Sequence, residues 1–441
     1  MIHPLLIRYG IYPLHQLKTG RRVESWHQQF LRNQWRSSAE LHSWQEQRLQ
    51  KILNHAKQHV PYYREKLKGP WEEIPLLSKA MVRQEFDQLQ ALDKRRTFTT
   101  VRTSGSTGLP TTWRIDRQAE DVHNAIKWRG RGWWNFRVGN PQVWLWGRDE
   151  FLGARRSLRD LLVYNKHLLG LLDLSSETVV KFYQNLLRWK PSFLYGYPSG
   201  LVELVRLCEE KNYSLSSLKL KGVITTAEIL TQSQRAYLRQ AFDCPVINEY
   251  GCAEVQIIAF ECPQGSMHIN SDALRIEFLS GTRPVKAGEF GEIVVTDLFN
   301  ETMPLIRYRT GDVGRPREGS CPCGRKLPLM ELTVGREVAM IRLPDGRRLH
   351  PEVLTPPHEN PLFRLVERFR IVQEAPDFLK VQVMTQPERF DAVCHHFTNL
   401  IHDQIGNDLK IEFERVAEIP RDPSGKLRYF VSSLNGENRC A

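Results

Sequence analysis

The spacing of apolar side chains predicts both helices and strands along this chain. Between residues 37 and 60, apolar residues recur mostly at three- and four-residue steps, which is typical of one helix face, and Pro61 ends the pattern. Short apolar runs at 223–228 and 245–254 read instead as strands, the second ending in a polar turn with glycine. A helix is predicted to start near Thr231 between them.

This alternation of strand, polar end and helix is typical of parallel α/β units. Ligands bind at the carboxyl ends of the strands in such sheets, so we expect both polar ends to open onto one crevice. Past residue 335 the pattern changes to that of a small α+β domain of about a hundred residues. Its predicted elements are strands at 370–372, 378–383 and 409–414 and a helix over 387–405.

Length and composition indicate a globular enzyme-sized protein. The chain has 441 residues, of which 41% are hydrophobic and 25% charged, and its length suggests roughly two to three domains. No apolar run reaches the roughly 18–20 residues that would span a bilayer. The first residues are too short an apolar run, and too soon broken by charge, for a secretory signal. We therefore expect a cytoplasmic protein.

The net charge of +12 would suit nucleic acid, anionic lipid or polyphosphate ligands. Lysine and arginine are scattered, however, and no motif supports nucleic-acid binding. The eight cysteines of a cytosolic chain of this size do not indicate a disulfide framework.

The densest run of small and hydroxylated residues lies at 103–111, between predicted strands at 98–101 and 112–115. Its glycines allow a close approach of the backbone, and successive N–H groups and hydroxyls can surround a phosphate chain. No Gly-Lys-Ser/Thr follows, which excludes the nucleoside-triphosphatase loop. A flexible hairpin loop is the alternative, and the loop alone does not decide between them.

A stretch rich in aromatic residues follows this loop. It contains Trp128, Trp133, Trp134, Trp144 and Trp146. Aromatic side chains at this density are consistent with an acyl or aryl pocket, and equally with a packed core.

Five motifs in order resemble those of the AMP-forming, adenylate-forming enzymes, which include acyl-CoA synthetases, peptide-synthetase adenylation domains and luciferases. They are Thr103-Ser104-Gly105-Ser106-Thr107-Gly108, Glu249-Tyr250-Gly251-Cys252-Ala253-Glu254, Tyr308-Arg309-Thr310-Gly311-Asp312, Gly335-Arg336 and Ile419-Pro420-Arg421-Asp422-Pro423-Ser424-Gly425-Lys426. The short N-terminal region, Tyr62-Tyr63, residues 75–79 and the cysteine pattern are similar to the phenylacetate–CoA ligase and CapK-like branch.

The resemblance implies an α/β fold with two domains and a two-step reaction. A large adenylation domain of mixed sheets flanked by helices would span 1–335, and a small, mobile α+β lid domain carrying the catalytic lysine would span 336–441. A carboxylate would attack the α-phosphate of ATP to give an acyl-adenylate and pyrophosphate. CoA would then displace AMP. Positioning and charge compensation are the main catalytic needs of such a reaction.

The family's functional residues map onto positions of this chain. The phosphates would be surrounded by Ser104, Gly105, Ser106, Thr107 and Gly108, and Mg²⁺ would be bound by Glu254 and Thr107. The adenine would be held by Ala227, Glu228, Glu249, Tyr250 and Gly251. Asp312 would bind the ribose, and Arg336 would lie near the ribose and phosphates. Lys426 would bridge ATP and the attacking carboxylate, and both Lys426 and Glu254 would be catalytic.

Four departures from the family pattern affect these assignments. Thr111 stands where many members have lysine, Ala253 replaces a threonine, and Val338 stands where the hinge usually has Asp or Lys. The pantetheine-lining segment is degenerate at 345–351, which leaves the acceptor open. An amine, a hydroxyl or a carrier-protein thiol is the alternative to CoA, and a non-catalytic nucleotide-binding protein of polysaccharide biosynthesis is the alternative to an enzyme.

Three cysteines and one histidine form a candidate metal site. Cys262, His268, Cys321 and Cys323 would supply three thiolates and one imidazole, a set that suits a closed tetrahedral Zn²⁺ site. Related members of the branch carry such a site, which would be structural. The alternative is three reduced cysteines without metal.

Overall fold

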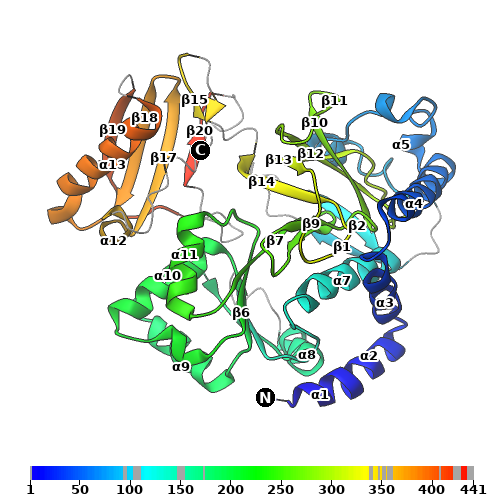
Figure 1. Ribbon diagram of the computed structural model, residues 1–441, viewed down its shortest axis with the longest axis horizontal. Coiled ribbons are helices and arrows are strands. Elements are labelled where there is room, and N and C mark those ends of the chain that lie inside the picture. The colour runs from blue at the N-terminus through cyan, green and yellow to red at the C-terminus, as the bar shows by residue number, and fades with distance from the viewer. Residues whose placement is uncertain are drawn as a thin grey trace.

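The computed structural model describes residues 2–92, 97–102, 111–146, 154–171, 174–336, 341–345, 348–349, 354, 361–406, 409–420 and 429–434. Within these residues, a mixed sheet of twelve strands forms the centre of the large N-terminal region (Figure 1). Along the sheet the order is β11-β10-β12-β13-β14-β9-β8-β7-β6-β5-β3-β4.

The first half of this sheet in chain order is parallel, as the sequence predicts. Its strands are β3 (Gln142–Leu145), β4 (Lys166–Leu169), β5 (Phe193–Gly196), β6 (Gly222–Thr226) and β7 (Val246–Cys252). Every residue of β5 and β6 is buried, as expected for parallel strands covered on both faces.

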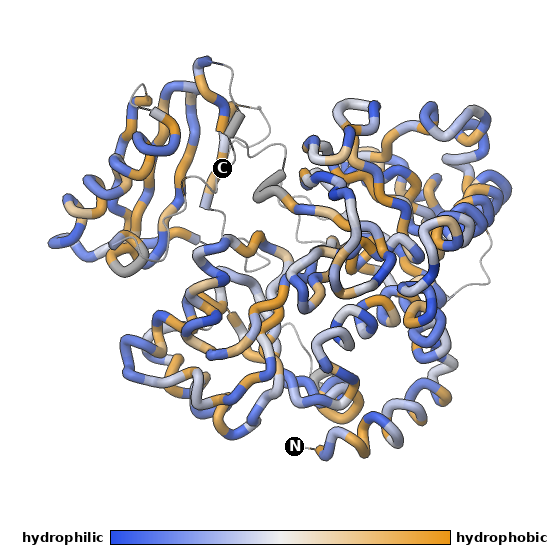
Figure 2. Tube along the Cα trace, viewed as in Figure 1, coloured by the Kyte–Doolittle hydropathy of each residue, from blue (hydrophilic) through white to orange (hydrophobic). Residues whose placement is uncertain are grey.

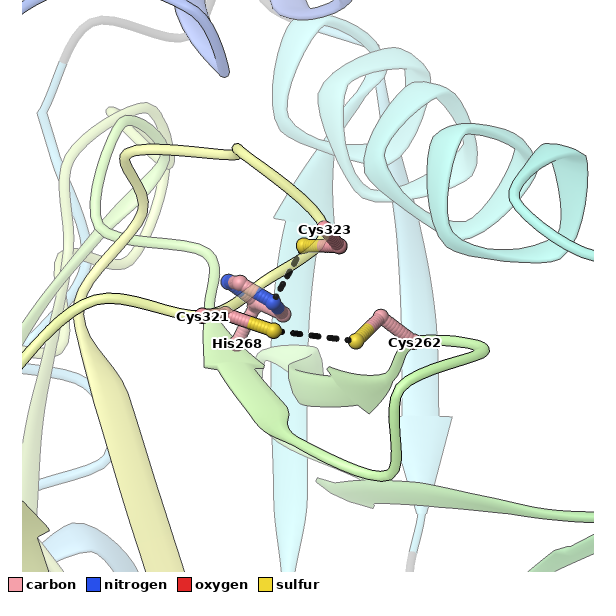
Figure 3. A group of neighbouring side chains, drawn as sticks. All are labelled: Cys262, His268, Cys321 and Cys323. Carbon is pink, nitrogen blue, oxygen red and sulfur yellow. Dashed lines mark hydrogen bonds between the residues drawn. The ribbon is translucent and has the colours of Figure 1, made fainter.

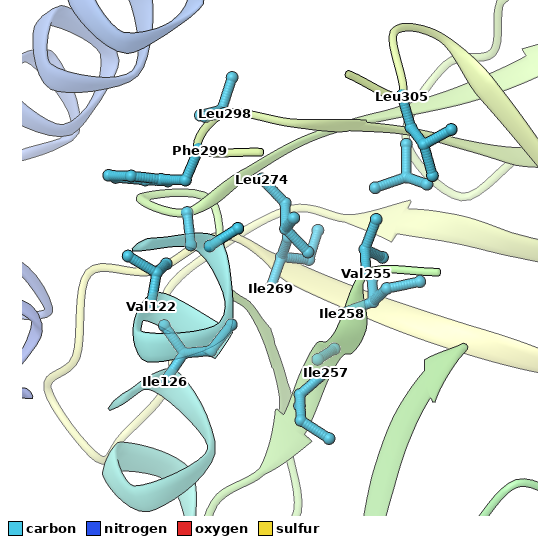
Figure 4. Close-up of a cluster of buried hydrophobic side chains, with 14 of the residues drawn as sticks. Val122, Ile126, Val255, Ile257, Ile258, Ile269, Leu274, Leu298, Phe299 and Leu305 are labelled. Carbon is cyan, nitrogen blue, oxygen red and sulfur yellow. The ribbon is translucent and has the colours of Figure 1, made fainter. Parts of the chain in front are cut away.

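Helices cover the parallel strands on both faces (Figure 1). These helices are α7 (Arg117–Gly132), α9 (Val179–Trp189), α10 (Pro198–Glu210) and α11 (Gln232–Phe242). Successive residues of β6 belong to different cores, because strand side chains alternate between faces. Val223 packs with α9, α10 and α11, while Ile224 belongs to the core that contains α7. Figure 4 shows the α7 side of this core, where Val122 and Ile126 lie near Ile257 and Ile258.

The second half of the sheet is antiparallel. Its strands are β8 (Gln256–Glu261), β9 (Met267–Ile269), β10 (Leu274–Ser280), β11 (Arg283–Pro284), β12 (Gly291–Asp297), β13 (Tyr308–Arg317) and β14 (Leu329–Arg336). β14 returns to pair with β9 through Leu329 opposite His268 and Met330 opposite Met267. This short pairing, here called the seam, joins the strands β10 to β14 to the strands β3 to β9.

Helices at the start of the chain pack beside this sheet. They are α1 (Pro4–Leu6), the π-helical η1 (Ile7–Ile11), α2 (Tyr12–Thr19), α3 (Val23–Asn33), α4 (Ser38–His59), α5 (Pro61–Arg64) and α6 (Lys79–Gln84). The predicted helix over 37–60 is confirmed as α4, and the Ser37–Glu40 capping box explains where it begins. The helices before residue 34 are not predicted by the apolar pattern.

The C-terminal part is an α+β unit with its own core, as predicted. Its four-stranded sheet has the order β19 (Lys410–Arg415), β18 (Phe378–Met384), β17 (Arg368–Ala375) and β20 (Phe430–Ser432). α13 (Phe390–Ile405) shares the buried core with this sheet, and β15 (Ile341–Arg342) and β16 (Arg348–Leu349) form a small separate sheet. The boundary at 335/336 stays a prediction, since 337–340 are outside the described residues.

A polar crevice separates the two parts of the molecule. Its volume is about 740 Å³, and side chains of α10 and α11 line it together with Leu365, Val366 and Glu367. Arg368 of β17 bridges it with an ion pair to Glu203 of α10, at 3.5 Å. This contact is thin and polar, as expected for an interface that can rearrange.

Arg129 of α7 provides a test of the packing around the antiparallel strands. Its buried guanidinium binds both carboxylate oxygens of Asp272, at 2.6 and 2.9 Å, and also contacts Asn270. We expect Arg129→Met to cost about 3–5 kcal/mol of unfolding free energy, because Asp272 is left buried and uncompensated. Denaturant unfolding measures this cost. Arg315→Met, which removes a half-exposed pair with Glu331, should cost about 0–1 kcal/mol. Equal losses of unfolding free energy in the two variants would contradict the conclusion that Arg129 compensates a buried charge.

Candidate functional site

The predicted strands on either side of the candidate phosphate loop are confirmed. β1 (Phe98–Arg102) and β2 (Thr112–Asp116) pair in antiparallel register as a separate hairpin. Thr111, at the start of β2, is buried, and its hydroxyl lies 3.3 Å from an amino group of Arg83. The assigned residues of the loop lie outside the described residues, namely Ser104, Gly105, Ser106, Thr107 and Gly108. Lys426 and Val338 lie outside them as well, and these assignments stay predictions.

The polar ends of β6 and β7 lie side by side, as expected from the sequence. Thr226 is paired with Glu249 in parallel register. Ala227 follows with a left-handed φ of 65°, which turns the chain away from the sheet. The Glu228 carboxylate accepts hydrogen bonds from the backbone N–H and the hydroxyl of Ser199, at 3.0 and 2.9 Å. Ser199 lies in the first turn of α10, so this bond ties the helix to the strand end.

The end of β7 differs from the sequence prediction. The predicted polar turn is instead strand as far as Cys252, which pairs antiparallel with β8. Gly251 allows this pairing, because a Cβ there would lie 1.8 Å from the carbonyl oxygen of Gln256. Tyr250 is therefore held in the β7–β8 pair, next to a register shift between Tyr250 and Gly251, and Glu254 lies in the turn that joins the two strands.

Two tyrosine hydroxyls hold two of the assigned carboxylates. Tyr250 donates to Oδ2 of Asp312 at 3.1 Å, and Tyr308 donates to Oε1 of Glu254 at 2.6 Å. Burial, with the charge of Asp312, raises the pKa of Tyr250 well above its usual value, so this hydroxyl stays a donor. Asp312 is opposite Arg336 in the β13–β14 register, while the Arg336 side chain is outside the described part. Four assigned positions thus lie on β7, the turn after it, β13 and β14, linked by these two hydrogen bonds and the β13–β14 pairing.

Glu249 is buried and has two polar partners, which lie close to aromatic rings. The Tyr195 hydroxyl donates to Glu249 at 2.6 Å, and Arg131 approaches the other carboxylate oxygen at 3.4 Å. The Tyr195 and Trp144 rings are 4.2 Å apart, and Trp146 lies 5.8 Å from Tyr195. Sequence reasoning did not single out Arg131, whose partners come from distant segments.

The tryptophans divide between the two alternatives left open by the sequence. Trp128 and Trp133 are buried in the core. Trp134, Trp144 and Trp146 are only partly buried, and the last two contact Tyr195 at the ends of β3 and β5. An acid-binding role is therefore open to Trp144 and Trp146, which border the assigned site.

Lys127 is a second cation that the sequence did not single out. It lies one turn before Arg131 on α7, and its ammonium donates to Asn124 at 2.7 Å. Burial, together with the nearby charges of Arg131 and Lys166, lowers the pKa of Lys127 to about 7. A signal was available in the sequence, because two cations four residues apart fall on one face of a mostly buried helix.

The four candidate metal ligands come together in one cluster (Figure 3). Cys262 and His268 flank the turn between β8 and β9, and Cys321 and Cys323 come from the connection between β13 and β14. All four ligand atoms lie within 4.8 Å of one another. The cluster lies directly beside the seam, because His268 itself pairs with Leu329.

The environment of the cluster suits a cation with soft ligands. Burial lowers the pKa of His268 to about 4, so its imidazole is neutral, as a ligand must be. Its Nε2 faces Cys323 at 3.3 Å, while Nδ1 lies 3.3 Å from the carbonyl oxygen of Leu327. That carbonyl can fix the tautomer that leaves Nε2 for a metal. Burial also raises the pKa of Cys262 to about 12, so a cation is needed to stabilise its thiolate.

The lowered pKa of Lys127 predicts that the stability of the folded protein depends on pH. The folded pKa is about 7 against an ordinary 10.5, so between these values the unfolded chain binds one more proton and stability rises with pH. Lys127→Met should therefore be stabilising below about pH 7, and its gain should shrink by up to about 1.4 kcal/mol per pH unit toward pH 10. Denaturant unfolding across this range measures the gain. The control Lys57→Met changes an exposed lysine of α4 and should show no such trend; a pH-independent gain for Lys127→Met would contradict the assignment.

Comparisons with known proteins agree with this architecture. Residues 344–433 match the family model of the CapK C-terminal domain. The phenylacetate-coenzyme A ligase of Thermus thermophilus is 24% identical over 429 residues, covering 88% of this chain and 95% of that protein. Protein CapK of Staphylococcus aureus is 23% identical over 424 residues, covering 90% and 91%.

A solved structure shares the fold over almost the whole chain. The 2-hydroxyisobutyryl-CoA ligase in the postadenylation state, in complex with 2-HIB-AMP, superposes with a TM-score of 0.73 at 20% identity, covering 92% of each chain. The same ligase in its thioesterification state gives 0.59, so the arrangement here is closer to the postadenylation state. In the described ranges, no helix is long and apolar enough to cross a membrane. The chain is therefore a relative of the phenylacetate–CoA ligase and CapK proteins, with the fold of the adenylate-forming ligases.

Proposed function

We propose that this protein is an ATP-dependent, AMP-forming ligase that activates an aryl or other carboxylic acid and transfers the acyl group to CoA. The observation that carries the proposal is the contact between the β7 segment and β13 through the Tyr250–Asp312 and Tyr308–Glu254 hydrogen bonds. This contact lies beside the paired strands β6 and β7, where Glu249 is opposite Thr226 and Glu228 follows β6. The relatives named as phenylacetate–CoA ligases support the activity, since they align with most of the chain. A cytoplasmic location is part of the proposal, because ATP and CoA are the cosubstrates.

The nucleotide would bind along these strand ends. Asp312 would accept hydrogen bonds from the two ribose hydroxyls, since a carboxylate offers two acceptor oxygens. The adenine would lie against Ala227, Glu228 and residues 249–251, and Arg336 would approach the ribose and phosphates. The loop at 103–108 would surround the phosphates with backbone N–H groups.

Glu254 has the chemistry of a Mg²⁺ ligand. A carboxylate oxygen is a donor that Mg²⁺ prefers, alongside phosphate and water oxygens, and Thr107 would contribute near the same ion. The bond from Tyr308 fixes the orientation of this carboxylate before any ion binds. Such an ion would offset the negative charge of the phosphates.

The C-terminal unit would bring Lys426 to the α-phosphate, where its charge offsets the charge that builds up during attack. The polar crevice and the Arg368–Glu203 pair support a movable unit, because a solvent-filled space and an ion pair between two parts can rearrange. The acid would lie near Trp144, Trp146 and Tyr195, whose rings border the same strand ends.

The degenerate sequence at 345–351 favours one further candidate. In this alternative the enzyme still forms the acyl-adenylate but passes the acyl group to an amine, a hydroxyl or a carrier-protein thiol. The degenerate segment at 345–351 is compatible with such an acceptor.

Pyrophosphate release across a panel of acids tests the proposal. We expect one class of acid to give ATP-dependent release, hydroxylamine to trap the adenylate, and CoA to yield a thioester. Lys426→Ala should slow adenylate formation by about 10²–10³-fold, because the charge is lost mainly in the transition state, with little change in ATP binding.

The matched control is Lys410→Ala, which changes an exposed lysine of β19 and should keep full activity. Adenylate formation at the native rate in Lys426→Ala would contradict the assignment. Stimulation by an amine or hydroxyl but not by CoA would favour the second candidate. ATP binding without pyrophosphate release for any acid would favour the non-catalytic alternative.

We also propose that the Cys262–His268–Cys321–Cys323 cluster binds one structural Zn²⁺. Three thiols and one neutral imidazole within one ion's reach match the ligand set and the closed geometry of such sites. The ion would stabilise the folded state, because the unfolded chain does not hold these ligands together.

Elemental analysis of the purified protein should find one zinc per chain. Cys321→Ser with Cys323→Ser should lose the metal and lower the thermal unfolding midpoint by roughly 10 °C, through lost binding to the folded state. Cys394→Ser, at a partly buried position on α13, is the control that should keep the metal. Native protein without zinc, and unchanged in stability when a chelator is added, would rule the proposal out.

A further inference from the structure

The first helices of the chain expose an unusual number of large apolar side chains. α1, η1 and α2 form a continuous rod from Pro4 to Thr19, which lies at the edge of the molecule (Figure 1). One side of the rod is buried through Ile7 and Tyr12, which pack against α8. The other side exposes Leu5, Leu6, Tyr9, Leu14 and Leu17, at 51–81% of their surface.

α8 (Ala154–Tyr164) packs beside the rod and exposes leucines of its own. Its Leu158 and Leu162 are also exposed, and its Tyr164 ring lies 5.9 Å from that of Tyr12 on the rod. We call the seven exposed side chains of these two elements the apolar face. In the described part of the chain, seven of the twelve exposed large hydrophobic residues belong to it. Figure 2 shows apolar positions recurring along the rod, although it borders solvent.

Basic residues outnumber acidic ones around the apolar face, where Glu24 is exposed after Arg22 and Arg21 is paired with Glu120 and Asp121. From residue 2 to residue 23 the chain carries four basic residues and no aspartate or glutamate. Lys18 and Arg22 are exposed at the end of the rod. On α8, the carboxylate of Asp160 is buried and paired with Lys166 and Arg159. The face therefore presents exposed cations beside exposed leucines.

We propose that the apolar face docks on the surface of an anionic lipid bilayer. Leu14 and Leu17 would enter the boundary between headgroups and acyl chains, and Lys18 and Arg22 would meet the lipid phosphates. This combination of apolar insertion and basic residues is how interfacial helices bind membranes without crossing them. A surface-bound rod also agrees with the lack of a membrane-spanning helix among the described residues.

A second copy of the chain fits this face less well. A two-fold dimer brings the same patch of both copies together. Lys18 would then approach its own counterpart on the second rod, and neither rod carries an acidic residue to offset this repulsion. The C-terminal unit lies at the opposite edge of the molecule (Figure 1). Docking through the rod therefore leaves the polar crevice beside the C-terminal unit accessible.

Vesicle sedimentation with the full-length protein tests this proposal. We expect binding to vesicles of phosphatidylcholine with phosphatidylglycerol, and much weaker binding to phosphatidylcholine alone or at high salt. Leu14→Ser with Leu17→Ser should lower the partition coefficient roughly 100-fold, because two apolar side chains no longer insert. Lys18→Glu with Arg22→Glu should lower it roughly 10-fold or more on anionic vesicles.

Leu187→Ser changes an exposed leucine of α9, outside the apolar face, and is the matched control that should bind as the native protein does. All variants should keep the native thermal unfolding midpoint, because the changed side chains are exposed. Native protein that does not sediment with anionic vesicles would overturn the proposal, as would equal binding by the Leu14/Leu17 variant. A dimer in solution that this variant abolishes, without vesicle binding, would assign the face to a second copy instead.

Discussion

The candidate site depends on one constraint: a carboxylate that is buried or partly buried beside the sheet must be met by a donor. Tyr308 meets Glu254, Tyr250 meets Asp312, and Tyr195 meets Glu249. An unmet carboxylate at these depths would be costly, so these pairs are part of the fold as well as of the site. They also orient the carboxylates before a ligand arrives, which lowers the cost of organising the site at the moment of reaction.

Much of the fold could be predicted because its signals are local. Apolar patterns predicted β6, β7 and the strands β17, β18 and β19, and the Ser37 cap with Pro61 bounded α4. The strands β15, β16 and β20 were not predicted. The rod from Pro4 to Thr19 was missed because it has apolar residues on both its buried and its exposed side, which blurs the helical period. The end of β7 was misjudged because glycine indicates a turn more often than a close strand pair.

The site could be predicted in part. Asp312, Glu254 and Glu249 are recognisable because they lie in short ordered motifs. The side chains that hold them are not, since Tyr195 meets Glu249 across 54 residues and Tyr250 meets Asp312 across 62. Arg131 and Lys127 depend likewise on the placement of α7 against the sheet. The cysteine–histidine cluster was predicted from residue chemistry, whereas its position beside the seam required the structure.

That position has a consequence for the order in which the chain assembles. The strands β10 to β13 intervene between β9 and β14, so the seam closes only after this long excursion has folded back. Closing a loop of this length carries an entropic cost, and the two paired positions between β9 and β14 offset little of that cost. Backbone pairing at the seam is therefore weak, and the buried core that spans it holds the two groups of strands together. A cation bound at the seam would be held by Cys262 and His268 from the β9 side and by Cys321 and Cys323 from the β14 side. Such a cation would crosslink the two groups of strands, so that closure of the seam would depend on the supply of metal.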